Sequence, residues 1–355
     1  MREHESVRRL RARAQALAGG VREASAAAVV RRAFAIQAQD ATAADLGIRV
    51  RGRDITATGI RTAYEEERSI VRGWFMRGTL HTIPSEDLRW VLRLLAPRIL
   101  TGTSLRYRQL GLDDDRRRRA DRLIRRVLAT HGPLTRAELT EHLTTLGVPA
   151  DGQAPFHLIR HAALGGVLCH GPRRDGVATY VLLDDWLPSS GSPLEGTAAL
   201  AELARRYLAA HAPATPEDFA AWSGLPVTWA GKAWKALAQS GAINEHGTQT
   251  VPAGWEDLEV ASGAPDVRML PAYDNYLVGY RTREASVPVS HHARVWPGGG
   301  IIRPTVIADG LVVATWTRSG ARSIQVAAFE PLPPEILLGV DAEVAAITRF
   351  LRPDQ

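Results

Sequence analysis

Residues 131–138 read HGPLTRAE, and residues 211–218, eighty positions further along the chain, read HAPATPED. A basic stretch with helical character precedes each copy, RLIRRVLATHG before the first and ELARRYLAAHA before the second. Histidine, a small residue and proline then interrupt the helical pattern, and threonine follows two positions later. The repeat therefore predicts, twice, that one helix ends and a second helix begins directly after it.

The threonine of each copy predicts where the second helix starts. Thr135 and Glu138 have the spacing of a capping box, in which each side chain bonds the other residue's backbone. Thr215 is followed by Pro216, which is an N-cap with proline at the first helical position. A third helix and an extended segment follow in both copies, and this order is that of a winged helix-turn-helix. The extended segments are GGVLCHGPRRDGVATYVLL at 165–183 and SGAINEHGTQTVP at 240–252.

The first third of the chain follows the same order. Apolar residues on one helical face mark a first helix around 7–17, and Ser25 can cap a second helix that runs toward Gln37. A third helix is predicted over 60–68 and a β-hairpin over 69–84. The sequence thus predicts three tandem winged-helix units.

Beyond Val251, short β-type runs alternate with Gly/Pro turns, and a helix is predicted at 341–351. This pattern indicates a small, mostly antiparallel β-rich unit. The predicted fold class is α+β, mainly α, with a linker at 189–196 (SSGSPLEG). The four predicted segments are 1–110 and 111–188 for the first two winged-helix units, 189–250 for the third, and 251–355 for the β-rich unit.

The amino-acid composition excludes several classes of protein. The chain has 355 residues, of which 45% are hydrophobic and 23% charged, and this is ordinary globular composition rather than that of a disordered chain. The single cysteine, Cys169, excludes a disulfide framework and a cysteine-rich zinc module, and fits a reducing, cytoplasmic location. No apolar run approaches the roughly 18 residues of a membrane span. The N-terminus has the pattern of an amphipathic helix rather than of an export signal.

Basic residues outnumber acidic ones by 44 to 38, and every cation except Lys232 and Lys235 is arginine. Arginine binds phosphate bidentately, although the base composition of the genome would explain the preference equally well. Paired arginines fall where a winged helix would meet DNA, in the turn between the wing strands and in the helix before the motif. A solvated basic face is the alternative for each pair. The candidate DNA-binding residues are Arg173, Arg174, Arg205 and Arg206.

Common catalytic signatures are missing. The sequence contains no GxSxG, HExxH, Walker loop or dinucleotide fingerprint. Neither His81 nor the pair His291 and His292 has a carboxylate partner at a recognisable spacing, so no metal site is expected. Asp40, Asp45 and Asp54 have the residue type of a general acid but also that of a cap or loop residue. The residues alone indicate a tandem winged-helix DNA-binding protein.

Gln37 and Gln39 are the candidate catalytic residues. They are separated by about 200° on a helix, so both can face one cleft only at a helix end or in extended backbone. Here the chain resembles the AlkZ-like winged-helix DNA glycosylases, whose signature is Gln-x-Gln or, in another branch, Gln-x-Asp. Four further stretches match this family: WFMRGTLHTIP at 74–84, RHAALGGVLCHGP at 160–172, MLPAYDNYLVGYR at 269–281 and WPGGGIIRPTVIADGLVVATW at 296–316.

The resemblance covers nearly the whole chain and implies a function. It implies a monofunctional DNA glycosylase that hydrolyses the N-glycosidic bond of N7-alkylguanine, with tandem winged helices forming a concave surface that faces DNA. The Gln-x-Gln form is similar to a subgroup from antibiotic-producing actinobacteria that unhooks azinomycin-type interstrand crosslinks, which implies a role in self-resistance. The implied partner is double-stranded DNA carrying N7-alkylguanine or a crosslink, bound by a monomer without a metal or organic cofactor.

The resemblance also implies roles for single residues. Gln37 is expected to position the hydrolytic water and Gln39 to contact the sugar or the water. In the C-terminal motif, packing in the core is the alternative to a direct contact with DNA. The candidates there and nearby are Tyr273, Asp274, Tyr276, His291 and His292 for lining the substrate cleft, and Arg281 for binding DNA.

Two amides suit this chemistry. Alkylation at N7 makes the guanine cationic, so it leaves as a neutral base and needs no general acid. The protein then has to stabilise an oxocarbenium-like sugar and to position a water. Glutamine carbonyl groups can position the water by accepting its hydrogen bonds. A crosslinked guanine cannot rotate freely out of the duplex, so the expected site is an open cleft. The alternative function is a non-catalytic winged-helix regulator or a drug-sequestering DNA-binding protein.

Overall fold

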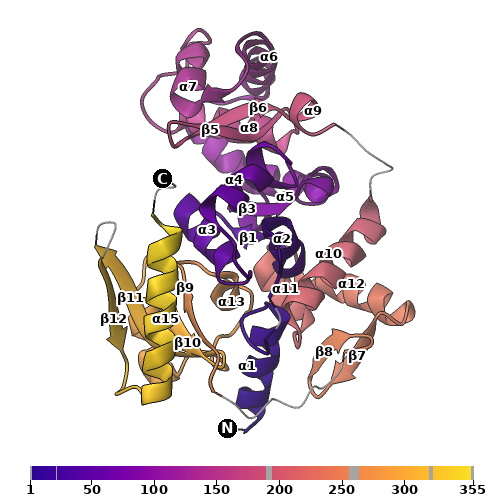
Figure 1. Ribbon diagram of the computed structural model, residues 1–355. Helices are drawn as coiled ribbons and strands as arrows, with labels where there is room; N and C mark the ends of the chain where they lie inside the picture. Colours follow the sequence, from indigo (N-terminus) through magenta and orange to yellow (C-terminus); the bar gives the residue numbers. More distant parts are fainter. Residues whose placement is uncertain (1, 21, 189–193, 256–263, 320–322, 353–355) are drawn as a thin grey trace. The chain divides into compact units, whose positions relative to one another are not determined.

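The computed structural model describes residues 2–20, 22–188, 194–255, 264–319 and 323–352 (Figure 1). The chain forms two compact units: unit 1 contains residues 1–60 and 200–355, and unit 2 contains residues 61–199. The boundaries fall inside α4 (Ala57–Glu65) and α10 (Gly196–His211). None of the described helices combines the length and the apolar composition that crossing a bilayer requires.

Unit 2 begins with an antiparallel hairpin and ends with a three-stranded sheet. In the hairpin, Arg77 and Gly78 lie between the two strands and have positive φ, 55° and 70°. The sheet has the order β4-β6-β5. The elements are β2 (Ile70–Trp74), η1 (Met76–Gly78), β3 (Leu80–Pro84), η2 (Ser85–Asp87), α5 (Leu88–Gln109), α6 (Asp114–His131), β4 (Leu134–Thr135), α7 (Arg136–Thr144), α8 (Ala154–Leu164), β5 (Leu168–Arg174), β6 (Val177–Leu182) and α9 (Leu183–Trp186).

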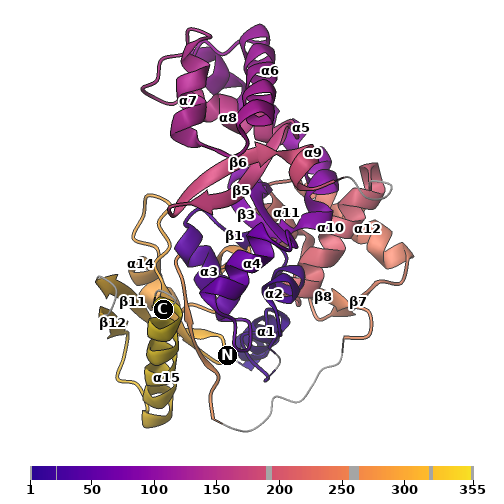
Figure 2. The ribbon, with the colours of Figure 1, turned by 45° about the horizontal axis from the view of Figure 1, so that its top comes forward.

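The element order of α6 to β6 is the one predicted around the first copy of the repeat. α6 ends at His131, and Thr135 caps α7 in a complete capping box with Glu138. α6, α7 and α8 lie beside the β5–β6 hairpin (Figure 2). In that hairpin Arg174 pairs with Val177, so the two predicted wing arginines stand at its tip.

Unit 1 combines the N-terminal helices with the second copy of the repeat and the C-terminal sheet. That sheet is antiparallel with the order β12-β11-β10-β9, and α15 packs along it (Figure 1). Its elements are α1 (Arg2–Ala14), α2 (Ala26–Ala33), β1 (Ile36–Gln37), α3 (Ala41–Arg49), α11 (Pro216–Ser223), α12 (Val227–Gln239), β7 (Ile243–His246), β8 (Gln249–Pro252), β9 (Val267–Leu270), α13 (Asn275–Val278), η3 (Val289–His291), α14 (His292–Val295), β10 (Thr305–Ala308), β11 (Leu311–Ser319), β12 (Ser323–Ala328) and α15 (Pro334–Phe350).

The boundaries of three predicted elements need correction. The terminal helix begins at Pro334 rather than at 341, because proline is well suited to the first turn of a helix. α2 ends at Ala33, four residues before Gln37. The third N-terminal helix is shifted to 57–65. Residues 189–193 of the predicted linker lie outside the described residues.

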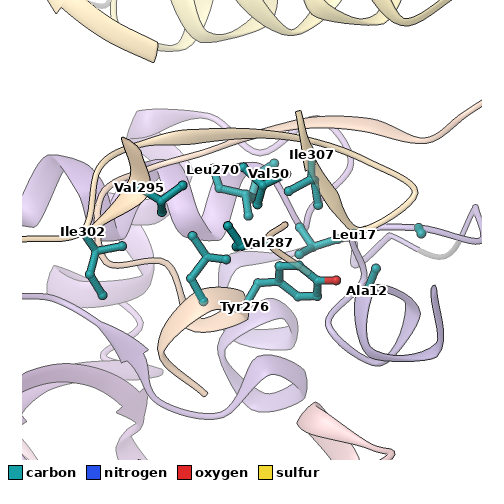
Figure 3. Packing of buried hydrophobic residues seen from close by; sticks show 12 residues of the cluster. Ala12, Leu17, Val50, Leu270, Tyr276, Val287, Val295, Ile302 and Ile307 are labelled. Carbon is teal, nitrogen blue, oxygen red and sulfur yellow. The ribbon is translucent and has the colours of Figure 1, made fainter. Parts of the chain in front are cut away.

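One hydrophobic core joins the two ends of the chain. Its N-terminal members include Ala12, Leu17 and Val50, and its C-terminal members include Leu270 and Tyr276. Figure 3 shows the Tyr276 ring beside Leu17 and Ala12. Residues separated by more than 200 positions thus share one interior, and for this reason the four predicted segments do not coincide with the two compact units.

Two histidines are almost completely buried in these interiors. His211, with 0% exposure, stacks on Tyr207 with the ring centroids 4.5 Å apart, and its Nδ1 lies 3.0 Å from the Tyr207 carbonyl oxygen. His81, with 1% exposure, lies in unit 2 and bonds the Thr79 carbonyl. Burial lowers the pKa of each imidazole to about 3, so both are neutral at physiological pH.

We expect the free energy of unfolding to fall as the pH falls from about 6.5 toward 3. In this window the unfolded chain protonates both histidines and the folded protein does not, so acid favours unfolding. Each histidine accounts for roughly 2 kcal/mol between pH 7 and pH 5. Urea unfolding of the wild type and of His211→Phe at both pH values measures the effect. The variant should lose part of the pH dependence of the wild type. Equal pH dependence in the wild type and His211→Phe would contradict this account.

Candidate active site around the two glutamines

The Gln37-Ala38-Gln39 segment lies in non-helical backbone between two helices. α2 stops because Phe34 and Ala35 take positive φ values of 24° and 66°, and β1 follows at Ile36–Gln37. Gln37 is half-buried, Ala38 is buried and Gln39 is exposed. Gln37 is the last residue of β1, and Gln39 lies in the bend that follows. The segment is not helical, so the separation of about 200° that a helix would impose does not apply to it.

The backbone of this segment is held by the side chain of Asn275. Its Oδ1 accepts a hydrogen bond from the Gln37 N–H at 3.0 Å, and its Nδ2 donates to the carbonyl oxygens of Ala35 at 2.9 Å and Ala33 at 3.4 Å. Asn275 is 2% exposed, so its bonds are sheltered from water. One amide thus fixes the chain on both sides of the positive-φ turn.

Asn275 is itself placed by an ion pair at its neighbour, Asp274. The Arg51 guanidinium binds this carboxylate bidentately, at 2.7 and 2.8 Å, and both side chains are 1% exposed. Arg51 also donates to the Gly47 carbonyl and to Gln15, at 2.9 and 2.7 Å. Asp274 in addition accepts from the backbone N–H of Tyr276 and so caps α13. Arg51 and Asn275 were missed from the sequence, although Asn275 lies inside the YDNY stretch of the matched C-terminal motif.

The candidate site residues of the C-terminal motif differ in how deeply their side chains are buried. Asp274 is enclosed by its ion pair, and Tyr276, which is 1% exposed, donates its hydroxyl to the Gly310 carbonyl at 2.8 Å. Burial raises the pKa of Tyr276 to about 12. Both side chains therefore belong to the core, the alternative stated above, and neither offers a surface to a ligand. Tyr273 is half-buried with φ 60°, and Arg281 is exposed.

The two neighbouring histidines have local partners. The His291 Nε2 lies 3.9 Å from a carboxylate oxygen of Glu330, and its ring packs on Phe329. The His292 Nε2 lies 3.1 Å from the Val287 carbonyl oxygen. The partner Glu330 is far away in the sequence, and this explains why no recognisable spacing revealed it. Among the described residues, no group of three His, Cys, Asp or Glu side chains could hold a metal ion.

Asp40, the carboxylate closest to the motif in sequence, has a structural task. It is the N-cap of α3, and its side chain accepts the Ala43 N–H at 2.9 Å. The capping bond orients this carboxylate toward the helix start. Gln37 is half-buried, whereas Gln39 and Asp40 are both exposed.

The predicted DNA-binding arginines are ordered by acidic partners. In unit 2, Arg173 and Arg174 are exposed, Arg174 forms an ion pair with Glu138, and the Arg173 backbone N–H donates to Glu65. In unit 1, Arg205 and Arg206 each lie 2.7 Å from Glu202.

Comparisons with known proteins place these features in a family context. The model of a family described as DNA glycosylase AlkZ-like matches residues 30–350. An interstrand DNA cross-link repair glycosylase from Streptomyces sahachiroi is 29% identical over 311 residues, or 82% of each protein. The structure of Streptomyces sahachiroi DNA glycosylase AlkZ is similar with a TM-score of 0.80, at 24% identity over 98% of this chain and 96% of that one. The family match includes both glutamines and their support.

We expect Asn275→Ala to release the glutamine segment. The Gln37 amide hydrogen should exchange with solvent about ten to a hundred times faster, because it loses a buried acceptor worth about 1–3 kcal/mol. Hydrogen exchange followed by NMR measures this rate. Asn244→Ala, at an exposed position of β7, is the matched control and should leave the rate unchanged. Unchanged exchange in Asn275→Ala would mean that this side chain does not hold the segment.

Proposed function

The chain belongs to the AlkZ-like family of DNA glycosylases, and from this premise we propose that it hydrolyses the N-glycosidic bond of N7-alkylguanine, including guanine held in an interstrand crosslink. The observation that carries the proposal is the placement of Gln37 and Gln39. Gln37 is half-buried and Gln39 is exposed, in a non-helical segment whose backbone is held by the Asn275 side chain. Action on crosslinks is supported by the relative from Streptomyces sahachiroi, a cross-link repair glycosylase.

The proposed reaction uses the glutamines to hold water rather than to move protons. N7-alkylguanine is already cationic, so the C1′–N9 bond breaks with the bonding electrons going to the base, which leaves neutral. The sugar then develops oxocarbenium character, a water attacks C1′, and the proton that this water loses passes to solvent. The Gln37 carbonyl oxygen accepts a hydrogen bond from that water, and Gln39 contacts the water or the sugar. The product is an abasic site. A fixed backbone matters because donors and acceptors must be in place before charge develops.

The remaining parts of the proposal concern the partner. We take the substrate to be duplex DNA bound by a monomer through tandem winged-helix units that present a concave surface. The order helix, capped helix, helix and hairpin in α6 to β6 supports this, as do the exposed Arg173 and Arg174 at the hairpin tip. An open site suits a crosslinked guanine, since it is tethered through N7 in the major groove. Self-resistance to a DNA-alkylating antibiotic is the role that this chemistry would serve.

Gln37→Ala should lower the single-turnover excision rate about 10²–10³-fold, the typical cost of losing one preorganised polar contact at a transition state. Affinity for DNA should change little, because phosphate contacts elsewhere provide most of it. Release of free N7-methylguanine from methylated DNA measures the rate. A wild-type protein that binds this DNA and releases no base would instead support the regulator.

Asp40→Asn is the control for Gln37→Ala. Asparagine is as good an N-cap as aspartate, so α3 should keep its start, and the excision rate should fall less than about threefold. Gln39→Ala should also impair excision, by less than Gln37→Ala. An inactive Asp40→Asn beside an almost normal Gln37→Ala would mean a carboxylate mechanism and would remove the role assigned to the glutamines.

Neutralising Arg173 and Arg174 together with glutamine should weaken binding to all duplex sequences alike. If each contacts phosphate, the slope of log K against log salt should become shallower by about one or two units. Fluorescence anisotropy with several unrelated duplexes at varied salt measures both effects. A loss confined to one duplex would indicate base readout by the hairpin and would favour a sequence-specific regulator over a lesion glycosylase.

A further inference from the structure

The two copies of the sequence repeat differ in the burial of their third helix, the one that a winged helix-turn-helix places in the major groove. This helix is α8 in the first copy and α12 in the second. α8 packs against α5, α6, α7 and β2, all within unit 2. None of its residues is exposed. No face of α8 is therefore open to DNA.

The arginine of α8 binds groups inside unit 2. The Arg160 guanidinium donates to the Gly78 carbonyl oxygen at 3.1 Å and to the Thr103 hydroxyl at 3.2 Å. Gly78 lies between β2 and β3, and Thr103 belongs to α5, so Arg160 joins α8 to both elements. The side chains of α8 thus stabilise the interior of unit 2.

In contrast, α12 has one buried face and one exposed face. Its buried residues are Ala230, Ala233, Trp234 and Leu237, and α12 packs against α11. The opposite side of the helix, called the α12 face below, has helical spacing and is exposed along its whole length. The residues of the α12 face are Thr228, Gly231, Lys232, Lys235 and Gln239.

The α12 face is positively charged. It carries both lysines of the chain, Lys232 and Lys235, and the sequence of α12 contains no acidic residue. Neither lysine forms an ion pair with any of the described residues. The two are three positions apart and are therefore neighbours on the helix surface. Two adjacent ammonium groups on long flexible stems complement the phosphates of a nucleic-acid backbone.

The shape of the α11–α12 pair also suits a groove. α11 ends at Gly224, with φ 76°, and Pro226 is the N-cap of α12, so a short turn of the helix-turn-helix type joins them. A helix about 10–12 Å wide matches the major groove, which is about 12 Å wide. Gly231 and the open space around it allow a close approach. Val227 and Trp229, 54% and 37% exposed, stand at the N-terminal end, the part of a recognition helix that contacts bases.

The α11–α12 pair is also tied to the glutamine segment. The ring of Trp222, in α11, lies 6.4 Å from the ring of Phe34, three residues before Gln37. Asp218, also in α11, accepts a hydrogen bond from the Arg281 N–H at 2.9 Å. Arg281 ends the matched C-terminal motif that contains the support of the glutamines. A duplex bound to α12 would therefore have a defined position relative to Gln37.

We propose that α12, and not α8, is the helix that lies in the major groove of the bound duplex, with Lys232 and Lys235 on backbone phosphates and with Val227 and Trp229 toward the bases. The inference rests on the proposed function and adds to it the groove and the helix through which DNA is bound. N7 of guanine is a major-groove atom. The protein thus approaches the duplex from the groove in which the adduct projects.

The first measurement is binding of an undamaged 21-base-pair duplex at varied salt, which requires no excision. In Lys232→Gln/Lys235→Gln, affinity should fall about five- to thirtyfold, and the slope of log K against log salt should become shallower by about one to two units. Arg349→Gln/Arg352→Gln removes the same charge from two exposed positions at the end of α15 and is the control, expected to change affinity less than about twofold. Equal losses in both variants would overturn the proposal, because they would reflect net charge alone.

The second measurement identifies the groove by disulfide crosslinking. Cys169, the one cysteine of the chain, is 3% exposed, so Thr228→Cys introduces an accessible thiol on the α12 face. The undamaged duplex carries a disulfide-protected thiol tether at its central base pair, either on cytosine N4, which lies in the major groove, or on guanine N2, which lies in the minor groove. Thr228→Cys should react with the cytosine tether at least about ten times faster than with the guanine tether.

Two further thiols are the controls for the crosslinking. His161→Cys, at a half-buried position of α8, and Ala345→Cys, at an exposed position of α15, should react with neither tether. A cytosine tether that reacts equally with Thr228→Cys and Ala345→Cys would overturn the proposal. Preference of Thr228→Cys for the guanine tether, or faster reaction of His161→Cys than of Thr228→Cys, would also overturn it.

These results are separable from a failure of the proposed function. A protein without excision activity that still shows the salt and crosslinking effects would retain α12 as its groove-binding helix and lose the glycosylase assignment. An active glycosylase whose DNA binding is indifferent to Lys232 and Lys235 would retain the function and lose the role of α12. A wild-type dimer that Lys232→Gln/Lys235→Gln dissociates in sedimentation, with DNA binding unchanged, would assign the α12 face to a second copy of the chain and overturn the proposal.

Discussion

The ion pair between Arg51 and Asp274 is the constraint on which the glutamine segment depends. Removing two charges from water is costly, and the bidentate geometry with the added bonds to Gln15 and Gly47 offsets that cost. The loss of one partner would leave an uncompensated buried charge, typically a destabilisation of about 3–5 kcal/mol. Because Asn275 directly follows Asp274, the ion pair of Arg51 and Asp274 also fixes the position of Asn275, which holds the Gln37 backbone.

The same kind of contact recurs along the N-terminal segment. Arg11 pairs with Asp218 at 3.5 Å, donates to the Pro213 carbonyl and lies over the Tyr280 ring. Arg49 pairs with Glu343 at 2.6 Å, again with both side chains largely buried. Three arginines from the first 51 residues thus bind acids from the last 140. These pairs hold the N-terminus inside unit 1 and carry the two glutamines with it.

The glutamine segment combines a strained backbone turn with hydrogen bonds that stabilise it. Phe34 and Ala35 have positive φ, a conformation that non-glycine residues adopt at some cost. The three bonds of Asn275 and the burial of both residues stabilise that turn. The result is a short non-helical stretch that carries two glutamines and whose backbone is held by Asn275. A rigid support of this kind is what water positioning requires, since an amide that moves by about 1 Å loses its alignment.

The sequence by itself determined the local features of this protein. The capping box of Thr135 and Glu138, the cap at Thr215 and the β5–β6 hairpin depend on residues a few positions apart, and all are present. Helix geometry alone indicated that Gln37 and Gln39 can face one cleft only at a helix end or in extended backbone. Only the tertiary structure decided where α2 ends, which residues hold the glutamines and that the first 60 residues pack with the last 156. The physical reason is distance along the chain: Arg51 meets Asp274, and Asn275 meets Gln37, across more than 220 residues. Local propensity and periodicity contain no information on partners so far apart, because those contacts exist only after the chain has closed around one core.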